Sequence, residues 1–179
     1  MVTRQAALLR GVNVGKGNRI AMADLRELLG GLGYTEVKTL LNSGNAVFSS
    51  PRASAQDAAA RIGKALAAKL EVPGRVVVLS AAEMDLVIAE NPLQKIAVNP
   101  SRLLVAVWGA PSDRAKLVPL TKQEWGAEAL GLGSRAAYLW CAEGIIVSEL
   151  SKAVNKALRD SVTSRNWSTM LKLQAMLAV

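Results

Sequence analysis

The spacing of apolar residues along the first eighty positions predicts alternating strands and helices. Short apolar runs with the length and composition of β-strands occur at residues 4–9, 37–41, 46–49 and 76–79. Leucines at helical spacing, from Leu25 to Leu32, follow the first run, and a second apolar helix face around Ile62 precedes the fourth. The predicted order is β-α-β-β-α-β, which is that of a ferredoxin-like split unit.

The second half of the chain shows the same kinds of pattern. Its strand-like runs are residues 103–108, 128–132 and 136–141. A short helix is predicted between Pro111 and Pro119, a longer one carries Leu150 and Leu158, and a last helix is predicted to start at residues 163–167. With a first helix after residue 80, the predicted order of this half is α-β-α-β-β-α-α.

These patterns together predict an α+β fold of two ferredoxin-like (split β-α-β) units packed together. Residues 1–80 form the first unit, and residues 81–179 form a second α+β unit with C-terminal helices. The side chains expected to be largely buried are Leu8, Leu25, Leu28, Val47, Phe48, Ile62, Leu66, Val77, Val105 and Leu139.

Composition narrows the class of protein. Hydrophobic residues make up 51% of the 179 positions, which excludes a disordered chain. The longest apolar run, residues 103–108, is far shorter than the roughly 20 residues of a membrane span. The start of the sequence lacks the features of a secretion signal, and the single Cys141 has no partner for a disulfide. We therefore expect a soluble, cytoplasmic protein without membrane association.

The sequence contains no histidine. This absence removes Ser-His-Asp and Cys-His catalysis, the zinc-hydrolase motifs and the usual proton shuttle at neutral pH. We expect no metal and no cofactor, and no catalytic residue is predicted. Any catalysis would rest on carboxylates, lysine, tyrosine, hydroxyls or electrostatic stabilisation.

Positive charge is unevenly distributed along the chain. The net charge is +8, and the excess of Lys and Arg lies in residues 1–80, with 11 against 5 acidic residues, and in residues 151–179, with 5 against 1. Basic ends favour an anionic partner if the fold brings them together. A basic surface that only keeps the protein in solution is the alternative.

The residues most suggestive of a binding site follow the first predicted strand. Positions 10–19 combine three glycines with Arg10, Asn13, Lys16, Asn18 and Arg19. Glycines let successive backbone N–H groups converge on an anion. The spacing matches neither the Walker loop nor the dinucleotide fingerprint. The alternative is an ordinary strand–helix connection whose asparagines bond their own backbone.

Two other polar clusters are candidates. Because the first and third strands of this topology are antiparallel neighbours, Ser43-Gly44-Asn45 lies at the same end of the sheet as Arg10. Arg165 could bind a phosphate or carboxylate as a planar fork, or it could be a solvated surface residue. Asn166 could be the N-cap of the last helix. Strand residues 4–9 carry no aromatic side chain, so an RRM-type base-stacking surface is excluded.

Five ordered motifs resemble those of the protein family catalogued as domain of unknown function 1697. The motifs are ALLRGVNVG at residues 7–15, MADL at 22–25, SGNAVF at 43–48, NP at 91–92 and RNWST at 165–169. The resemblance implies two ferredoxin-like halves and supplies no activity. Two positions depart from the family pattern: Lys16 stands where the family usually has a second glycine, and Leu40-Leu41-Asn42 replaces a commoner Tyr-Ile-Gln.

The resemblance and the residue types together define one set of candidate ligand-binding positions. They are Arg10, Gly11, Asn13, Gly15, Asn18, Ser43, Gly44, Asn45, Arg165 and Asn166. The favoured interpretation is a binding module for an anionic small molecule or a nucleic-acid backbone. The alternatives are a histidine-free enzyme that uses the same cleft, with Asp24 the nearest acidic candidate, and a structural clasp between the two halves. We further predict that the three polar motifs converge on one site.

Overall fold

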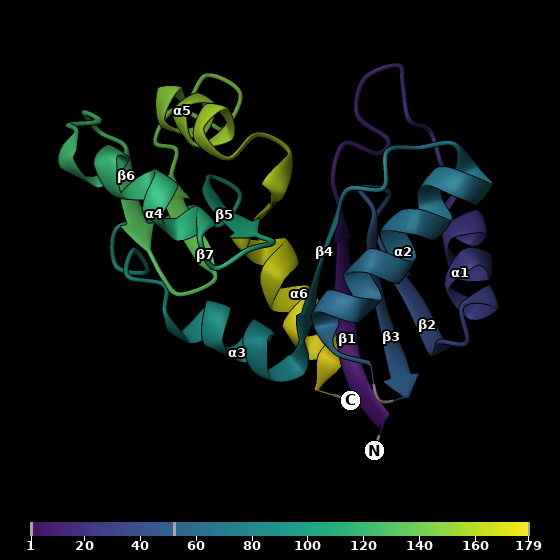
Figure 1. The fold of residues 1–179 in the computed structure, drawn as a ribbon. Coiled ribbons are helices and arrows are strands. Elements are labelled where there is room, and N and C mark those ends of the chain that lie inside the picture. The colour runs from purple at the N-terminus through teal and green to yellow at the C-terminus, as the bar shows by residue number, and fades with distance from the viewer. Residues whose placement is uncertain (1, 52, 179) are drawn as a thin grey trace. The chain divides into compact units, whose positions relative to one another are not determined.

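The computed structural model describes residues 2–51 and 53–178. The chain divides into two compact units, one made of Met1–Met84 and Leu173–Val179 and the other of Asp85–Lys172. Each unit contains one four-stranded antiparallel sheet (Figure 1).

The first unit has the strand order predicted for a ferredoxin-like unit. Its strands are β1 (Val2–Leu9), β2 (Thr35–Leu40), β3 (Asn45–Pro51) and β4 (Val76–Ser80), and its helices are α1 (Met22–Gly31) and α2 (Ala55–Leu70). In space the strands are ordered β2-β3-β1-β4, so β1 lies between β3 and β4 and is antiparallel to both. The register pairs Leu8 with Asn45 and Leu9 with Val76.

One face of this sheet packs against both helices. Leu9 of β1 and Phe48 of β3 share a buried cluster with Leu25 and Leu29 of α1 and Ile62 of α2. The leucines of α1 recur every three or four residues, so they fall on the side of the helix that meets the sheet. This packing fixes where β1 ends and α1 begins, and therefore where the loop between them is held.

Helix starts are capped by the side chains that the sequence places there. The Ser54 hydroxyl accepts a hydrogen bond from the Asp57 N–H at 3.0 Å at the start of α2. At the start of α3 (Ala81–Ala89) the bonds are reciprocal: Glu83 N–H donates to Ser80 Oγ at 3.2 Å, and Ser80 N–H donates to a Glu83 carboxylate oxygen at 2.8 Å. The pair Ser80 and Glu83 thus forms a complete capping box.

The second unit repeats the strand order of the first. Its strands are β5 (Leu103–Trp108), β6 (Ala129–Leu132), β7 (Ala136–Trp140) and β8 (Val162–Asn166). Its helices are α4 (Asp113–Leu117), α5 (Glu149–Leu158) and the 3₁₀ helices η1 (Val118–Lys122) and η2 (Arg159–Ser161). The last helix, α6 (Trp167–Leu177), belongs to this unit up to Lys172 and to the first unit from Leu173. The spatial order is β6-β7-β5-β8. An α+β fold consistent with two ferredoxin-like units is thus confirmed.

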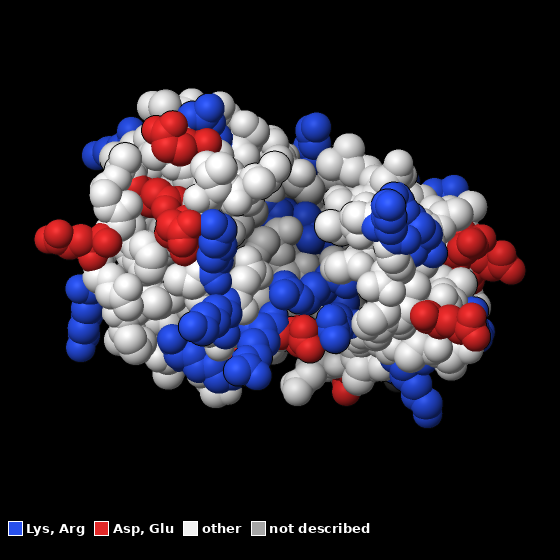
Figure 2. All heavy atoms as spheres, turned by 90° about the horizontal axis from the view of Figure 1, so that it is seen from above, with Lys and Arg blue, Asp and Glu red and all other residues white. Residues whose placement is uncertain are grey.

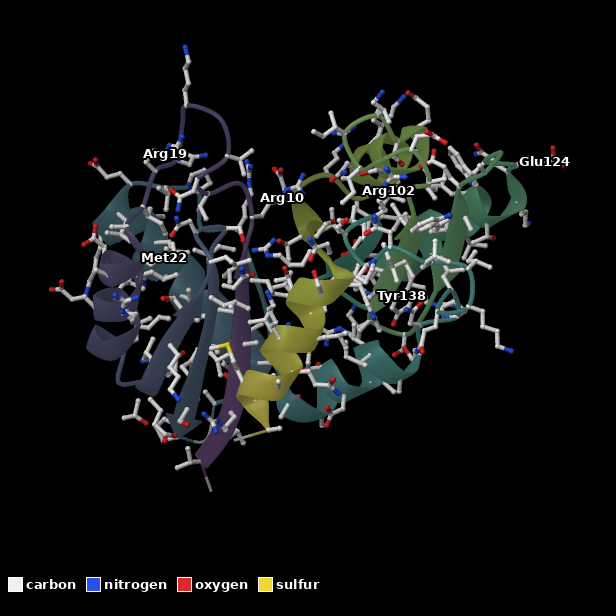
Figure 3. All side chains as sticks on the ribbon, turned by 180° about the vertical axis from the view of Figure 1, so that it is seen from behind. Arg10, Arg19, Met22, Arg102, Glu124 and Tyr138 are labelled. Carbon is white, nitrogen blue, oxygen red and sulfur yellow. The ribbon has the colours of Figure 1, made fainter. Side chains whose placement is uncertain are left out.

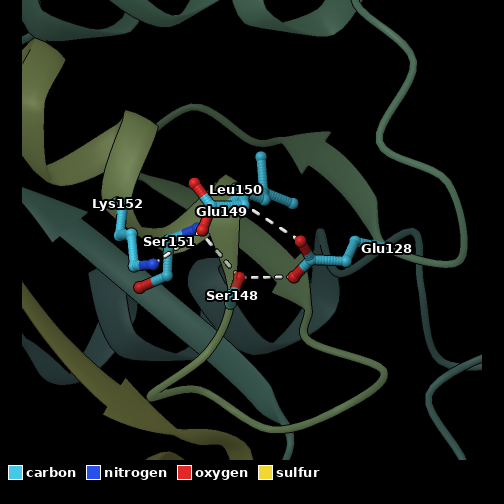
Figure 4. A network of polar contacts seen from close by, with 6 residues as sticks. All are labelled: Glu128, Ser148, Glu149, Leu150, Ser151 and Lys152. Carbon is cyan, nitrogen blue, oxygen red and sulfur yellow. Dashed lines mark hydrogen bonds and ion pairs between the residues drawn. The ribbon is translucent and has the colours of Figure 1, made fainter.

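The start of α5 is held by a carboxylate from another part of the unit (Figure 4). The Ser148 hydroxyl donates to the Glu128 carboxylate and accepts from the Ser151 N–H at 2.9 Å. Glu128 also accepts from the Leu150 N–H at 3.3 Å. A negative charge at a helix N-terminus is stabilising, so this network fixes α5 against the strand that follows Glu128.

Two details of the second half differ from the sequence prediction. Residues 163–166, expected at a helix start, belong to β8, which pairs with β5 from Leu104↔Asn166 to Trp108↔Val162. The sheet supplies the backbone hydrogen bonds of this segment, and the helix begins only at Trp167. Pro119 does not end the helical segment either, because η1 accommodates it in its first turn, where the missing N–H costs nothing.

The predicted core residues are buried. All ten side chains expected inside, from Leu8 to Leu139, have exposed fractions between 0% and 7%. Within the described residues, no helix has both the length and the apolar character needed to cross a membrane.

Candidate anion-binding site

Three connections of the first unit meet at one end of its sheet. These are residues 10–21 between β1 and α1, residues 41–44 between β2 and β3, and residues 71–75 between α2 and β4; we call them the loop end. Two backbone hydrogen bonds join them: the Leu9 N–H donates to Gly44 O and the Arg10 N–H donates to Arg75 O, both at 2.8 Å. In Figure 1 the loop between β1 and α1 projects from this end of the sheet.

Asn13 closes the first loop with its side chain. Its Oδ1 accepts from the Ile20 N–H at 2.9 Å, and its Nδ2 donates to Ile20 O at 2.9 Å and to Asn42 O at 2.6 Å. The backbone of Asn13 has φ = 55°, a left-handed conformation that asparagine tolerates better than most residues. One amide therefore ties the two ends of the loop together and ties the loop to the neighbouring turn.

Gly44 allows that turn to pack against the loop. Its φ is 83°, and a Cβ at this position would lie 2.6 Å from Val12 Cγ2 and 2.8 Å from Leu9 Cβ. Val12 is only 1% exposed, so the contact is part of the unit's core. Glycine is required here for both its conformation and its size.

Two further candidate asparagines, at and beside the loop end, also bond the protein's own atoms. Asn45 is fully buried, and its Nδ2 donates to Leu40 O and to Ser43 Oγ, both at 2.9 Å. The exposed Asn18 donates from Nδ2 to Gly11 O at 3.2 Å. The amides of Asn13, Asn18 and Asn45 thus shape the backbone, as the alternative interpretation of the loop expected.

The cationic side chains of the loop end lie at its surface. Lys16, Arg19 and Arg75 are exposed and Arg10 is half-buried. Figure 2 looks down on this end of the first unit and shows Lys and Arg side chains on its surface, and Figure 3 shows Arg10 and Arg19 on the connection that follows β1. Between residues 1 and 23 the sequence has no acidic residue, and Glu71 is the acidic residue of the loop end. The charge of this surface is therefore positive.

Arg19 is already oriented by the loop. Its Nη2 donates to Gly15 O at 2.7 Å, and Gly15 has φ = 64°. A guanidinium with one N–H group bonded to the backbone keeps further donors for an external acceptor. The loop thus restricts the orientation of the guanidinium, and a donor restricted in this way loses less entropy when it bonds an external acceptor.

Arg75 was not among the positions chosen from the sequence. It precedes β4, and the register of β1 with β4 places its backbone against Arg10. The predicted β-α-β-β-α-β topology implies this position, because the start of the fourth strand adjoins the end of the first in that fold. No sequence motif marks Arg75, because it lies outside any glycine- or asparagine-rich segment.

Asp24 gives no support to the enzyme alternative. It is exposed in the first turn of α1, where a carboxylate is favourable beside the helix N-terminus. A buried acidic group next to the loop would have provided a proton carrier, and Asp24 is not one.

The remaining two candidates lie in the second unit. The structure brings together Arg10, Gly11, Asn13, Gly15, Asn18, Ser43, Gly44 and Asn45 in the first unit and places Arg165 and Asn166 on β8. Asn166 Oδ1 accepts from the Ser168 hydroxyl and the Thr169 N–H, both at 3.0 Å, so it caps α6. That Arg165 and Asn166 share a site with the loop end stays a prediction.

Arg165 has an unusual environment for a cation. Its Nη1 donates to Thr163 Oγ1 at 3.0 Å and to Ser164 O at 2.8 Å. Burial lowers the pKa of the Arg165 guanidinium to about 10, because removing a charge from water disfavours the protonated form. It remains charged at neutral pH, and it is not the solvated surface residue that one interpretation of the sequence expected.

Comparison with known proteins gives a family and a fold. The family described as "Protein of unknown function (DUF1697)" matches residues 2–138, a range that includes the loop end and ends before Arg165. The structure of the conserved bacterial protein SP0830 from Streptococcus pneumoniae is similar, with 26% sequence identity, a TM-score of 0.82 and 99% of each chain covered. No curated protein matches the chain.

Proposed function

We propose that this chain, which belongs to the DUF1697 family, is a binding module whose loop end holds phosphate-bearing anions. The observation that carries the proposal is the placement of Arg10, Lys16, Arg19 and Arg75 around a backbone that internal hydrogen bonds hold in one shape.

The asparagines and the cations have different roles in this proposal. Asn13 and Asn45 form the scaffold, since their amide groups bond the protein's own backbone. The cations supply the attraction. Arginine presents a planar fork that matches phosphate oxygens, and lysine acts as a mobile point charge. A fixed backbone that carries such side chains loses less entropy on binding than a flexible loop would.

The glycines support the same ligand class. Gly11 and Gly15 have φ values of 69° and 64°, and a Cβ at either position would meet nothing within 4 Å. These glycines are therefore needed for backbone conformation and not for packing. Alternating left-handed residues turn backbone N–H groups toward one side, and such an arrangement attracts anions.

The ligand has two sources that share this chemistry, a free polyphosphate and the phosphate backbone of a nucleic acid. Nothing at the loop end stacks on a base, because its side chains include no aromatic ring. Binding of a nucleic acid would therefore be independent of sequence and would weaken steeply with salt, since bound cations release counterions from the backbone.

The test is a titration of the whole protein with tripolyphosphate and with a short DNA duplex, each at low and moderate salt. We expect the double variant Lys16→Ala/Arg19→Ala to bind both probes about tenfold more weakly or worse at low salt, because two phosphate contacts are lost. Its matched control is Lys64→Ala/Lys69→Ala, which removes two exposed charges from α2 in the same unit and should bind like the native protein.

The possible outcomes distinguish a small polyphosphate from a nucleic acid as the ligand, and both of these from failure of the proposal. Loss of tripolyphosphate binding alone would identify a small polyphosphate ligand, and loss of DNA binding alone a nucleic-acid backbone. If the α2 control variant bound the probes equally weakly, the loss of affinity would be explained by the lower net charge alone. Native affinity in the Lys16/Arg19 variant for both probes would contradict the proposal.

A further inference from the structure

An open cavity in the second unit has no role in the proposed function. It has a volume of about 340 Å³ and is lined by Glu90, Arg114, Leu132, Gly133 and Ser134. This volume lies at the lower end of the range for small-molecule sites. The lining residues come from the segment after α3, from α4, from the end of β6 and from the turn between β6 and β7.

Two opposite charges are fixed on the two sides of one peptide group in that turn. Glu90 Oε2 accepts from the Ser134 N–H at 2.7 Å and from the Ser134 hydroxyl at 2.9 Å. Arg114 Nε–H donates to Gly133 O at 3.0 Å. The carbonyl of Gly133 and the N–H of Ser134 belong to the same planar unit and point in opposite directions. The turn therefore holds a carboxylate and a guanidinium apart.

Each charged group keeps capacity for a ligand. Among the described residues no ion pair joins Glu90 to Arg114. A guanidinium has five N–H donors, of which the contact with Gly133 uses one, and its terminal fork suits a carboxylate. The hydrogen bonds from Ser134 go to Oε2 of Glu90, which leaves Oε1 as an acceptor for a cationic donor.

Gly133 is needed for this arrangement. A Cβ at residue 133 would lie 2.6 Å from Glu90 Oε2 and 3.1 Å from the Tyr138 hydroxyl oxygen. The Tyr138 hydroxyl donates to Val87 O at 2.5 Å and is buried, so it has no room to withdraw. A side chain at position 133 would therefore displace the carboxylate of Glu90 while leaving Arg114 in place.

From this geometry we propose that the cavity binds a small zwitterion, a molecule with one carboxylate and one ammonium group such as a free amino acid. Arg114 binds the carboxylate end through its terminal fork, and Glu90 binds the ammonium end through Oε1. A molecule with both charges satisfies both groups at once, whereas an ion of one sign leaves the opposite group of the cavity unmatched.

The test follows amide NMR signals of the whole protein during titration with glycine, β-alanine and γ-aminobutyrate, three zwitterions of increasing length. Acetate and methylammonium serve as probes with a single charge. We expect the amides of Gly133 and Ser134 and the Nε–H of Arg114 to shift to saturation with at least one zwitterion. Acetate and methylammonium should bind at least about tenfold more weakly, which corresponds to the loss of one matched charge.

Variants separate the two halves of the site. Arg114→Gln should reduce zwitterion binding to the level of methylammonium, and Glu90→Gln to the level of acetate. Gly133→Ala keeps both charges but moves Glu90, so it should lose zwitterion binding and retain that of acetate. Lys122→Gln and Glu124→Gln are the matched controls, because neither residue lines the cavity and Glu124 points outward in Figure 3.

The absence of a saturating shift with all three zwitterions would overturn the proposal. So would equal affinity for acetate and the zwitterions, which would reduce the cavity to a single-charge anion site. A Gly133→Ala protein that folds and binds the zwitterion like the native protein would contradict the role of Glu90. Each variant's own spectrum shows whether it is folded, so a loss of structure is recognised directly.

Discussion

At the scale of single residues, the polar motif of the first unit contains two kinds of side chain. The amides of Asn13 and Asn45 are directed at the protein's own backbone: Asn13 ties the loop after β1 to the turn between β2 and β3, and Asn45 closes that turn. The cations at Lys16 and Arg19 are exposed. Residue type alone does not separate these roles, because an asparagine in a glycine-rich loop can either bond a ligand or close a turn.

Gly44 gives the sharpest test at this scale. Substitution of Gly44 by Ala adds a Cβ within 2.8 Å of both Val12 and Leu9 and forces a left-handed conformation with φ = 83° on an L-residue. We expect the free energy of unfolding to fall by about 1–3 kcal/mol, from overpacking and backbone strain. Urea denaturation measures this change.

Gly17 is the matched control for that substitution. It lies in the same loop as Val12, which Gly44 contacts, but a Cβ at position 17 would meet nothing within 4 Å and its φ is not positive. Gly17→Ala should therefore change the free energy of unfolding by less than about 0.5 kcal/mol. A Gly44→Ala protein as stable as the Gly17→Ala protein would show that the close packing of turn and loop is not needed.

At the scale of elements, the sequence predicted most strands and helices because their apolar periodicity is strong. The run from Leu103 to Trp108 became β5 with the same bounds, and Leu150 and Leu158 lie on the buried face of α5. β8 was missed because an edge strand needs few apolar side chains. Its residues 163–166 are polar, and its structure depends on backbone pairing with β5.

The candidate site was also predicted only in part, because some of its residues are brought together by strand pairing and not by a local sequence pattern. The shared location of Arg10 and Asn45 followed from the antiparallel order of β1 and β3, and the structure confirms it. Arg75 was not predicted, because it is the pairing of β1 with β4 that brings it near Arg10. The residues next to Arg75 in the sequence give no sign of this proximity. The bonding of each asparagine amide depends on interatomic distances, which no sequence pattern contains.

The edge strand β2 provides a prediction about pH. Glu36 lies at a register irregularity in the pairing of β2 with β3, with φ = 51°. The Ser49 hydroxyl donates to its carboxylate at 2.5 Å. This hydrogen bond, together with the charges of Arg4 and Lys38, lowers the pKa of Glu36 below its ordinary value. The interaction therefore stabilises the fold above the ordinary pKa of glutamate and is lost as the pH falls through the lowered pKa.

Ser49→Ala removes the largest cause of that shift, so the pKa of Glu36 should rise toward its ordinary value, as followed by NMR titration of the carboxyl carbon. Ser50→Ala is the control, because the Ser50 hydroxyl is buried and makes no hydrogen bond among the described residues. A pKa of Glu36 that rises in neither variant would assign the shift to the neighbouring cations instead. An equal rise in both variants would show that the effect is not specific to the Ser49 hydroxyl.

At the scale of the whole molecule, the two units repeat one strand order and differ in the chemistry they expose. The loop end of the first unit carries several cations and a single acidic residue, Glu71, whereas one anion and one cation, Glu90 and Arg114, line the cavity of the second unit. The net charge of +8 acts over the Debye length and concentrates polyanions near the surface. In the proposed function, the local arrangement at the loop end makes that attraction specific for phosphate.

The most direct measurement is a phosphate titration followed at every backbone amide of the intact protein. The proposal predicts that pyrophosphate shifts the amides of residues 10–19 and Arg75 to saturation, that sulfate at equal ionic strength shifts them less, and that Lys16→Ala/Arg19→Ala removes the effect. Shifts that are absent at the loop end, or that are spread evenly over exposed lysines including those of α2, would contradict it.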